Sequence, residues 1–201
     1  LTLVMIGAGL LWFGWFGFNA GSALAANNTA AVVFMNTFAA TCAAAIGWLL
    51  TEKIRDGHAT SLGAASGVVA GLVAITPSCS SVSPIGALIL GLVAGVVCAL
   101  AVGLKYRLGY DDSLDVVGVH LVGGLIGTLL IGLLATEAAP AGVNGLFYGG
   151  GLTQFWSQLI AAVSVLVYSF VVAYIVAKVI DMTWGIRIPE EDEVTGIDLT
   201  T

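Results

Sequence analysis

His120 is the first candidate for chemistry in this sequence, because it lies in the apolar run Val116–Leu134, which holds no other ionisable residue. An ionisable side chain is costly at the depth of a bilayer, and it usually faces a protein-lined interior in which it has a function. Three glycines follow it at three, four and seven positions: Gly123, Gly124 and Gly127. On an α-helix this spacing places them on the same face as the histidine. The pattern predicts a slim face along which another helix or a narrow conduit approaches the imidazole.

Asp115 stands five residues before His120, at the start of the same apolar run. One interpretation makes Asp115 the cap of its helix, where a carboxylate accepts backbone N–H bonds at the positive end of the helix dipole. The other makes it part of a pathway, which a capping residue can also shape. For His120, the alternative to a functional role is a neutral imidazole that hydrogen-bonds between helices.

The segment Gly14–Ser22 holds a second group of candidates. Residues three or four positions apart share one face of a helix, and here they are Leu11, Trp15, Phe18 with Asn19, and Ser22. An indole face attracts a cation, more strongly where water is excluded, and amide and hydroxyl oxygens accept hydrogen bonds from N–H donors. This combination suits a small cation that also donates hydrogen bonds. The alternative is an interfacial aromatic belt with ordinary interhelical hydrogen bonds.

Other kinds of site find little support in the sequence. The three cysteines, Cys42, Cys79 and Cys98, never stand in CxxC spacing, so we interpret them as small packing residues. No ligand set for zinc, haem or an iron–sulfur cluster can be assembled, and we expect neither a metal nor a cofactor. No basic patch suggests nucleic acid. His58 lies in a basic loop, where we expect it to be solvated.

The composition indicates that a membrane surrounds these residues. Hydrophobic residues make up 59% of the chain and charged residues 9%, whereas about a quarter of the residues in a soluble domain are charged. A span needs about 20 apolar residues, and six candidates occur at residues 3–24, 31–50, 61–76, 85–104, 116–135 and 153–183. We therefore predict an all-α, polytopic transmembrane helix bundle over residues 1–184. Pairs of glycines four residues apart are expected to pack these helices closely.

The third predicted span is short and ends at Thr76-Pro77, where proline halts a regular helix. Short, glycine-rich or proline-interrupted spans are typical of transporters. The last span is long: its 31 residues correspond to about 46 Å of helix, against a bilayer core of about 30 Å. We expect it to tilt or protrude.

The basic residues predict the orientation of the bundle. All six lie near the end of the second, fourth or sixth span or after it: Lys53, Arg55, Lys105, Arg107, Lys178 and Arg187. By the positive-inside rule these sites are cytoplasmic, as are both ends of the chain. Residues 185–201 form an acidic cytoplasmic tail in this prediction. The chain begins at Leu1 without Met or a basic segment, so we expect that its first apolar run is no signal peptide and that sequence continues upstream.

Four motifs carry a resemblance to a known family: GWFGFNAGS, TPSCSS, DVVGVHLVGG and GIRIPEEDE. In order and spacing they resemble the Amt/Mep/Rh ammonium transporters, and the bacterial Amt branch most closely. The resemblance extends over essentially all 201 residues. It implies eleven spans, built as two inverted five-span repeats and a long final helix, with this chain as spans six to eleven. The upstream repeat would then supply the first of two paired pore histidines, a buried aspartate and the aromatic partners of an outer site.

The resemblance also implies roles for individual residues. Ser22 resembles the serine of an outer ammonium-recruitment site, Phe18 one of two stacked gating phenylalanines, and His120 the second histidine of the pair. Asp115 matches the acid at the start of the histidine helix. The remaining matches, on or beside the conduction path, are Leu11, Trp15, Asn19, Thr76 and Val116. The family further implies a homotrimer in the cell membrane and, in many prokaryotes, a P-II signal protein on the cytoplasmic face.

The leading hypothesis is ammonium transport for nitrogen uptake, in which an outer site recruits the cation and ammonia passes a histidine-lined pore. An intact ammonium ion loses too much hydration energy in a narrow apolar conduit, whereas neutral ammonia does not. Desolvation should keep His120 largely neutral. The alternative is an ammonium sensor that signals through a cytoplasmic partner. A hydrolase built on Ser22, His120 and Asp115 is disfavoured, because Ser22 and Asp115 are expected at opposite membrane faces and a triad must meet within about 3 Å.

Overall fold

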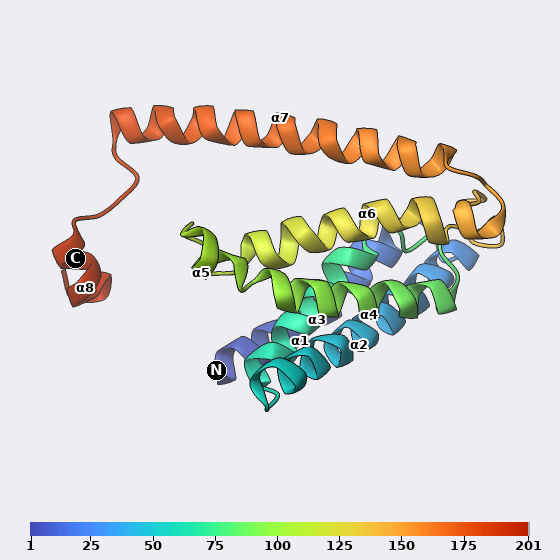
Figure 1. Cartoon of the computed structure of the whole chain (residues 1–201), viewed down its shortest axis with the longest axis horizontal. Coiled ribbons are helices and arrows are strands. Elements are labelled where there is room, and N and C mark those ends of the chain that lie inside the picture. The colour runs from blue at the N-terminus through green and yellow to red at the C-terminus, as the bar shows by residue number, and fades with distance from the viewer. Residues whose placement is uncertain (201) are drawn as a thin grey trace. The chain divides into compact units, whose positions relative to one another are not determined.

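The computed structural model describes residues 1–200 and is all-helical over that range (Figure 1). Its elements in the first 160 residues are α1 (Thr2–Gly21), α2 (Asn28–Asp56), α3 (Ser61–Ile75), α4 (Pro84–Ala101), α5 (Leu104–Leu108), the π-helix η1 (Val116–Leu121), α6 (Val122–Leu134) and the short 3-10 helix η2 (Leu146–Tyr148). They are followed by α7 (Thr153–Thr183), α8 (Glu190–Thr195) and α9 (Ile197–Thr200). These elements form two compact units, Leu1–Ile160 and the segment from Ala161 onward.

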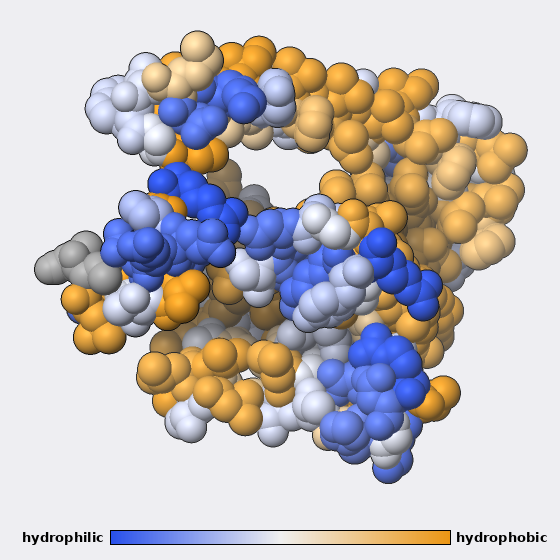
Figure 2. Space-filling model, turned by 60° about the vertical axis from the view of Figure 1, so that its left-hand side comes forward, coloured by the Kyte–Doolittle hydropathy of each residue, from blue (hydrophilic) through white to orange (hydrophobic). Residues whose placement is uncertain are grey.

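Among residues 1–200, five stretches are long and apolar enough to cross a membrane: Thr2–Gly21, Asn28–Asp56, Pro84–Leu108, Val116–Leu134 and Thr153–Thr183. The third predicted span corresponds to α3, which at 15 residues is a shorter apolar helix. Large hydrophobic side chains stay exposed on the flanks of the helices, among them Phe13 at 79% and Ile89 at 47%. Figure 2 shows the extent of this apolar surface, which is uncommon on soluble monomers. The prediction of an all-α membrane bundle is confirmed.

Three helices of the first unit begin at a side-chain cap. Asn27, Thr60 and Ser83 each accept a hydrogen bond from the backbone N–H three residues later, at 3.0, 2.8 and 3.1 Å. Pro84 follows Ser83 at the first helical position, where its missing N–H leaves no bond unmade. Each cap contributes about 1 kcal/mol, so short polar segments suffice to start α2, α3 and α4.

The core of the bundle is the close approach of α3 and α4 to α2. A Cβ atom on Gly67 or Gly71 of α3 would contact Ala44, Ala45 or Thr41 of α2, and one on Gly91 or Gly95 of α4 would overlap the backbone of Ala40 or Ala44. Both helices therefore meet α2 at small residues, as expected of small-xxx-small pairs. Ala40 and Ala44 are fully buried between them.

The turn from α3 to α4 is anchored to α2 by a buried amide. Asn36 of α2 donates from Nδ2 to the carbonyls of Cys79 and Val82, at 2.9 and 2.8 Å. The chain after α6 returns to the same turn, where Thr136 N–H donates to the Ser81 carbonyl at 3.0 Å. Burial raises the pKa of the Cys79 thiol, which keeps the thiol protonated and unreactive near neutral pH. The TPSCSS motif thus connects α2, the turn from α3 to α4 and the segment after α6 at one end of the bundle.

The second unit holds the remainder of α7 and the end of the chain. Gly185 has a φ of 77°, a left-handed conformation that follows the end of α7. The predicted acidic tail contains two short helices, α8 and α9, and its last residue, Thr201, lies outside the described residues. Arg187 and Glu193 form an exposed ion pair at 2.9 Å within it.

Candidate functional site

A hydrogen-bond network joins the polar residues of α1 to α2 and to the end of α3. Trp15 Nε1 donates to Thr76 Oγ1 at 2.7 Å, and Thr76 Oγ1 lies 3.2 Å from Asn19 Oδ1 and 2.7 Å from the Leu72 carbonyl. Asn19 is buried, and its Nδ2 donates to Thr37 Oγ1 at 3.1 Å. Three of the predicted site residues, Trp15, Asn19 and Thr76, therefore form one polar cluster. Thr37 completes it and was not predicted.

The aromatic face beside this cluster is open. The rings of Trp15 and Phe18 meet edge to face, with centroids 5.6 Å apart. They line a shallow apolar pocket of about 310 Å³ together with Leu10, Leu11 and Gly14. Phe18 is 63% exposed. An indole and a phenyl ring on an uncovered surface can stack with another aromatic side chain or contact a cation.

Ser22 follows Phe18 by one turn, at the C-terminal end of α1. Its Oγ donates to the Phe18 carbonyl at 2.6 Å, and its side chain is exposed. The hydroxyl proton is therefore engaged with the backbone, while the oxygen lone pairs face outward and can accept from an N–H donor. Ser22 belongs to the same helix face as Phe18 but is not hydrogen-bonded to the polar cluster.

His120 sits in a π-helical turn in which the two residues before it enter the core. Gly118 and Val119 are buried. A Cβ on Gly118 would contact Val102, the C-cap of α4, and the Val119 carbonyl lies 3.9 Å from Cys98 Sγ. Because its neighbours occupy the core side, His120 is exposed. Residues 1–200 thus do not themselves provide the protein-lined surroundings that the sequence predicts for this imidazole. Val116 is exposed as well, at 52%.

The three glycines after His120 differ in their surroundings. Gly123 lies against Ala70 and Val73 of α3, and Gly127 lies against Ala74 and Pro77, whereas Gly124 has open space beside it. The contacts of Gly123 and Gly127 with α3 agree with the predicted slim face that another helix approaches. That His120 shares this face stays a prediction.

These contacts place His120 and the polar cluster at successive levels of the bundle. Gly123 is level with Ala70 and Val73, and Gly127 with Ala74, so α3 and α6 run side by side in the same direction. His120 is one turn before Gly123, and Thr76 directly follows α3. At 1.5 Å per residue the two levels are roughly 10 Å apart along α3.

Asp115 has a different role from the cap predicted for it. It makes no capping hydrogen bond. Instead Asp112 accepts the N–H groups of Val116 and Val117, at 2.7 and 2.9 Å, while the Asp115 carboxylate pairs with Lys105 Nζ at 2.8 Å. The cap is displaced because Asp115 takes a left-handed backbone, with φ 56°, which turns its side chain away from the helix it precedes.

The hydrolase hypothesis has no geometric basis in this chain. Ser22 lies shortly before the start of α2, whereas Asp115 lines a pocket with Arg55 and Asp56 at the end of α2. The 29 residues of α2 separate those ends by about 40 Å. Among residues 1–200 there is also no group of three His, Cys, Asp or Glu side chains able to hold a metal ion.

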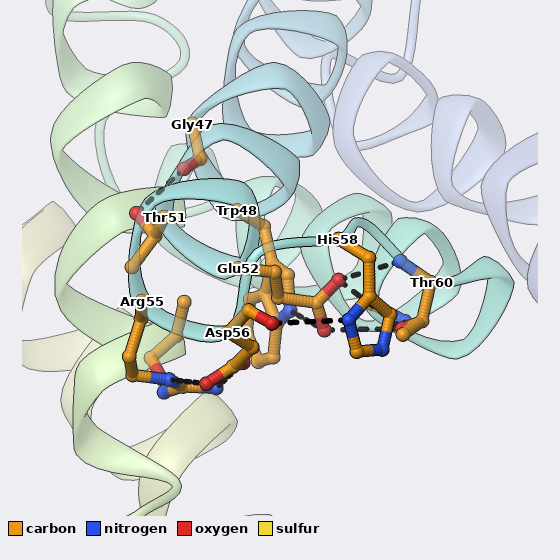
Figure 3. Close-up of polar contacts among 10 residues, drawn as sticks. Gly47, Trp48, Thr51, Glu52, Arg55, Asp56, His58 and Thr60 are labelled. Carbon is orange, nitrogen blue, oxygen red and sulfur yellow. Dashed lines mark hydrogen bonds and ion pairs between the residues drawn. The ribbon is translucent and has the colours of Figure 1, made fainter.

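A buried carboxylate at the end of α2 was missed in the sequence (Figure 3). Glu52 is 8% exposed and accepts from Trp48 Nε1 at 3.2 Å, from Thr60 N–H at 2.8 Å and from the Thr60 hydroxyl at 3.1 Å. Glu52 thereby connects Thr60, the N-cap residue of α3, to α2. Its spacing of four from Trp48 is the signal that could have identified it. His58 lies in the same loop and is exposed, as predicted, with Nδ1 3.1 Å from the Asp56 carbonyl.

Comparison with known proteins adds an independent line of evidence. The family model described as Ammonium Transporter Family matches residues 1–201. An ammonium transporter of Mycobacterium tuberculosis strain H37Rv is 64% identical over 204 residues, which cover 98% of this chain and 43% of that protein. The chain therefore spans less than half the length of this relative.

Solved structures agree with the sequence match. The crystal structure of Candida albicans Mep2 aligns with a TM-score of 0.84 at 32% identity, covering 93% of this chain and 43% of that one. A structure described as a sensor Amt protein aligns with a TM-score of 0.88 at 29% identity, covering 97% of this chain and 47% of that one.

Proposed function

This chain belongs to the ammonium transporter family, and we propose that the whole protein conducts ammonium or ammonia across the cell membrane for nitrogen uptake. The observation that supports the proposal most directly is the arrangement along α3. The Trp15–Thr76–Asn19 cluster stands at one level and His120 roughly 10 Å further along. This is the order in which a cation would first be held and its neutral form then conducted.

In this proposal, the exposed face of α1 with Trp15, Phe18 and Ser22 recruits the cation. The indole of Trp15 and the ring of Phe18 present π faces to a cation, and Ser22 Oγ offers lone pairs to an N–H donor. Because Trp15 Nε1 is bound to Thr76, the ring is fixed in one orientation. Phe18 acts as the gate below the recruitment site, and Leu11 lines the apolar wall of the same pocket.

Conduction beyond the gate requires the loss of a proton. An apolar passage cannot replace the hydration shell of an ammonium ion, whereas ammonia is uncharged and still forms hydrogen bonds. His120 provides such hydrogen bonds at depth, with Val116 and Asp115 one turn nearer the inner end. A potassium ion has no proton to release, so this route discriminates against it. His120 needs a facing wall for this role, and we propose that the rest of the whole protein supplies it, including a second histidine.

The distribution of charge supports an inward orientation of one end. Lys53 and Arg55 lie in the last turn of α2, and Lys105 and Arg107 in α5. By the positive-inside rule this end is cytoplasmic, together with the acidic tail from residue 185. We propose a homotrimer in the cell membrane, with a P-II signal protein as the candidate partner at this end.

The test is charge displacement in proteoliposomes that contain the whole protein. An ammonium pulse should give a sustained, protein-dependent current or an electroneutral change of internal pH. A potassium pulse of equal size should give neither. Absence of both signals after ammonium, in vesicles whose protein is folded and correctly assembled, would overturn transport.

The second candidate function is an ammonium sensor, which the alignment with a sensor Amt structure favours. In that case the open face of α1 binds ammonium and the tail passes the signal to a cytoplasmic partner. Ammonium binding measured by calorimetry, without current and without internal pH change, would support the sensor.

A further inference from the structure

We propose that Lys105 is a positioning residue that fixes the direction of the His120 imidazole. The inference rests on the proposed conduction role of His120, but it concerns the geometry of the turn that carries this histidine. Lys105 itself lies in α5, fifteen positions earlier, and its Nζ hydrogen-bonds to Asp112 and Asp115.

Lys105 binds both ends of the turn that precedes the π-helix. Its Nζ donates to the Asp112 carbonyl at 2.9 Å and to the Asp115 carboxylate at 2.8 Å. The lysine side chain is only 14% exposed. An ion pair that is partly screened from water and held by a second hydrogen bond is geometrically stricter than a surface pair. The charged Nζ of Lys105 thus fixes the four-residue turn from Asp112 to Asp115.

The backbone of this turn includes a residue in an unfavourable conformation, which the contacts of Lys105 stabilise. Asp115 is one of two non-glycine residues at positive φ among residues 1–200, with φ 56° and ψ 33°. Aspartate tolerates the left-handed region better than most residues but still disfavours it. The Lys105 contact compensates for this strain, and the turn then delivers the N–H groups of Val116 and Val117 to Asp112.

The π turn transmits this geometry to His120. Residues 116–121 carry i→i+5 hydrogen bonds, so the turn accommodates one residue more than an α-helical turn. Its far end is fixed because Gly123 and Gly127 lie against α3. Its near end is fixed by Lys105 and Asp112. If the near end is released, the turn can relax toward α-helical spacing, in which a shift of one residue is a rotation of about 100°. His120, between the two fixed ends, would then change direction.

Two other basic residues lie near Lys105. Its pocket, of about 640 Å³, is also lined by Arg55 and Arg107. Arg55 is held by Asp56 and by the Ala99 carbonyl, at 2.7 and 2.8 Å. Arg107 lies on the same short helix as Lys105 and is exposed, which makes it the matched control for loss of one positive charge at this end.

The experiment uses the whole protein with three substitutions: Lys105→Met, Lys105→Arg and Arg107→Met. The first readout is the ¹⁵N resonance of the His120 ring in histidine-labelled protein, assigned by its loss in His120→Ala. Lys105→Met should shift or split this resonance, Lys105→Arg should restore it in part, and Arg107→Met should leave it unchanged. This readout needs no transport, so it stands even where the proposed function fails.

The second readout is the ammonium-evoked current. Lys105→Met should lower the maximal current several-fold and leave the half-saturating ammonium concentration unchanged, because the outer site on α1 is untouched. An unchanged His120 resonance in Lys105→Met, or an equal shift in Arg107→Met, would overturn the proposal. If Lys105→Met does not assemble, Asp115→Asn removes the ion pair alone; it should shift the same resonance, and no shift there would also overturn the proposal.

Discussion

The Nε1 atom of Trp15 and the Oγ1 atom of Thr76 lie 2.7 Å apart, although 61 positions separate the two residues in the chain. The bond connects α1 to the end of α3, and Asn19 joins it through the same hydroxyl. Thr76 thereby orients an indole on an open helix face. An indole held this way presents one fixed π surface, which a freely rotating tryptophan would not.

Replacing Thr76 by valine tests this orienting bond. Thr76→Val keeps the shape of the side chain but leaves the part-buried Trp15 N–H without its acceptor. Such a loss costs about 1–3 kcal/mol for a fully buried donor and less for a part-buried one. We expect thermal unfolding at lower temperature and a several-fold rise in the ammonium concentration that half-saturates the current. Thr41→Val is the matched control, because the Thr41 hydroxyl bonds only to the Thr37 carbonyl of its own helix. An equal effect of both substitutions on half-saturation would contradict an orienting role for Thr76.

Replacing Ser22 by alanine tests cation recruitment. Ser22→Ala removes the exposed oxygen beside Phe18, so ammonium uptake should fall more at low concentration than at saturation. Initial rates over a range of ammonium concentrations measure the difference. Ser157→Ala serves as control, because Ser157 is also exposed and also donates to the carbonyl four residues earlier. A proportional loss at all concentrations would argue against recruitment by Ser22.

Replacing His120 by alanine tests the conduction step. His120→Ala removes an exposed side chain, so the fold and the assembly should persist while conduction is reduced or its selectivity altered. Size-exclusion chromatography reports assembly, and proteoliposome currents with ammonium and potassium report conduction. His58→Ala, in the exposed loop after α2, should change neither. Unaltered flux and selectivity in His120→Ala would remove the central role of this histidine.

The helices and their packing could be predicted from local pattern, whereas the site geometry depends on distant contacts. The glycine pairs at Gly67/Gly71 and Gly91/Gly95 identify the tight crossings correctly, because small residues at spacing four act wherever two helices meet. The cap at Asp112 could not be predicted in the same way. The choice between Asp112 and Asp115 is made by Lys105 and by the left-handed backbone that it stabilises.

The surroundings of His120 illustrate a second limit. Its position in an apolar run predicts function, but its direction follows from Gly118 and Val119, which fill the space beside Val102 and Cys98. The local sequence pattern thus identifies His120 as a candidate, while the packing of Gly118 and Val119 at α4 leaves its side chain exposed.

The cap assignment yields a stability prediction. Asp112→Ala removes the acceptor for two backbone N–H groups at the start of the π-helix, and loss of a cap costs about 0.5–2 kcal/mol. Asp111→Ala removes a neighbouring acid that no hydrogen bond ties to this helix start, so it should be close to neutral. Thermal unfolding of the two variants in the same detergent measures the difference. Equal stability of the two would contradict a capping role for Asp112.

The tight crossing of α2 and α4 gives the last prediction. A methyl group on Gly91 would overlap the backbone of Ala40, and neither backbone can move without opening the contacts around buried Leu90 and Ala94. Overpacking of this kind typically costs about 1–3 kcal/mol, so Gly91→Ala should lower the unfolding temperature and the yield of assembled protein. Gly124→Ala is the control, since open space lies beside Gly124 and alanine favours the helix by about 1 kcal/mol. The added methyl group is thus expected to lower the stability at Gly91 and to raise it at Gly124, which separates the effect of packing from that of helix propensity. A destabilisation of equal size in both variants would refute the packing argument.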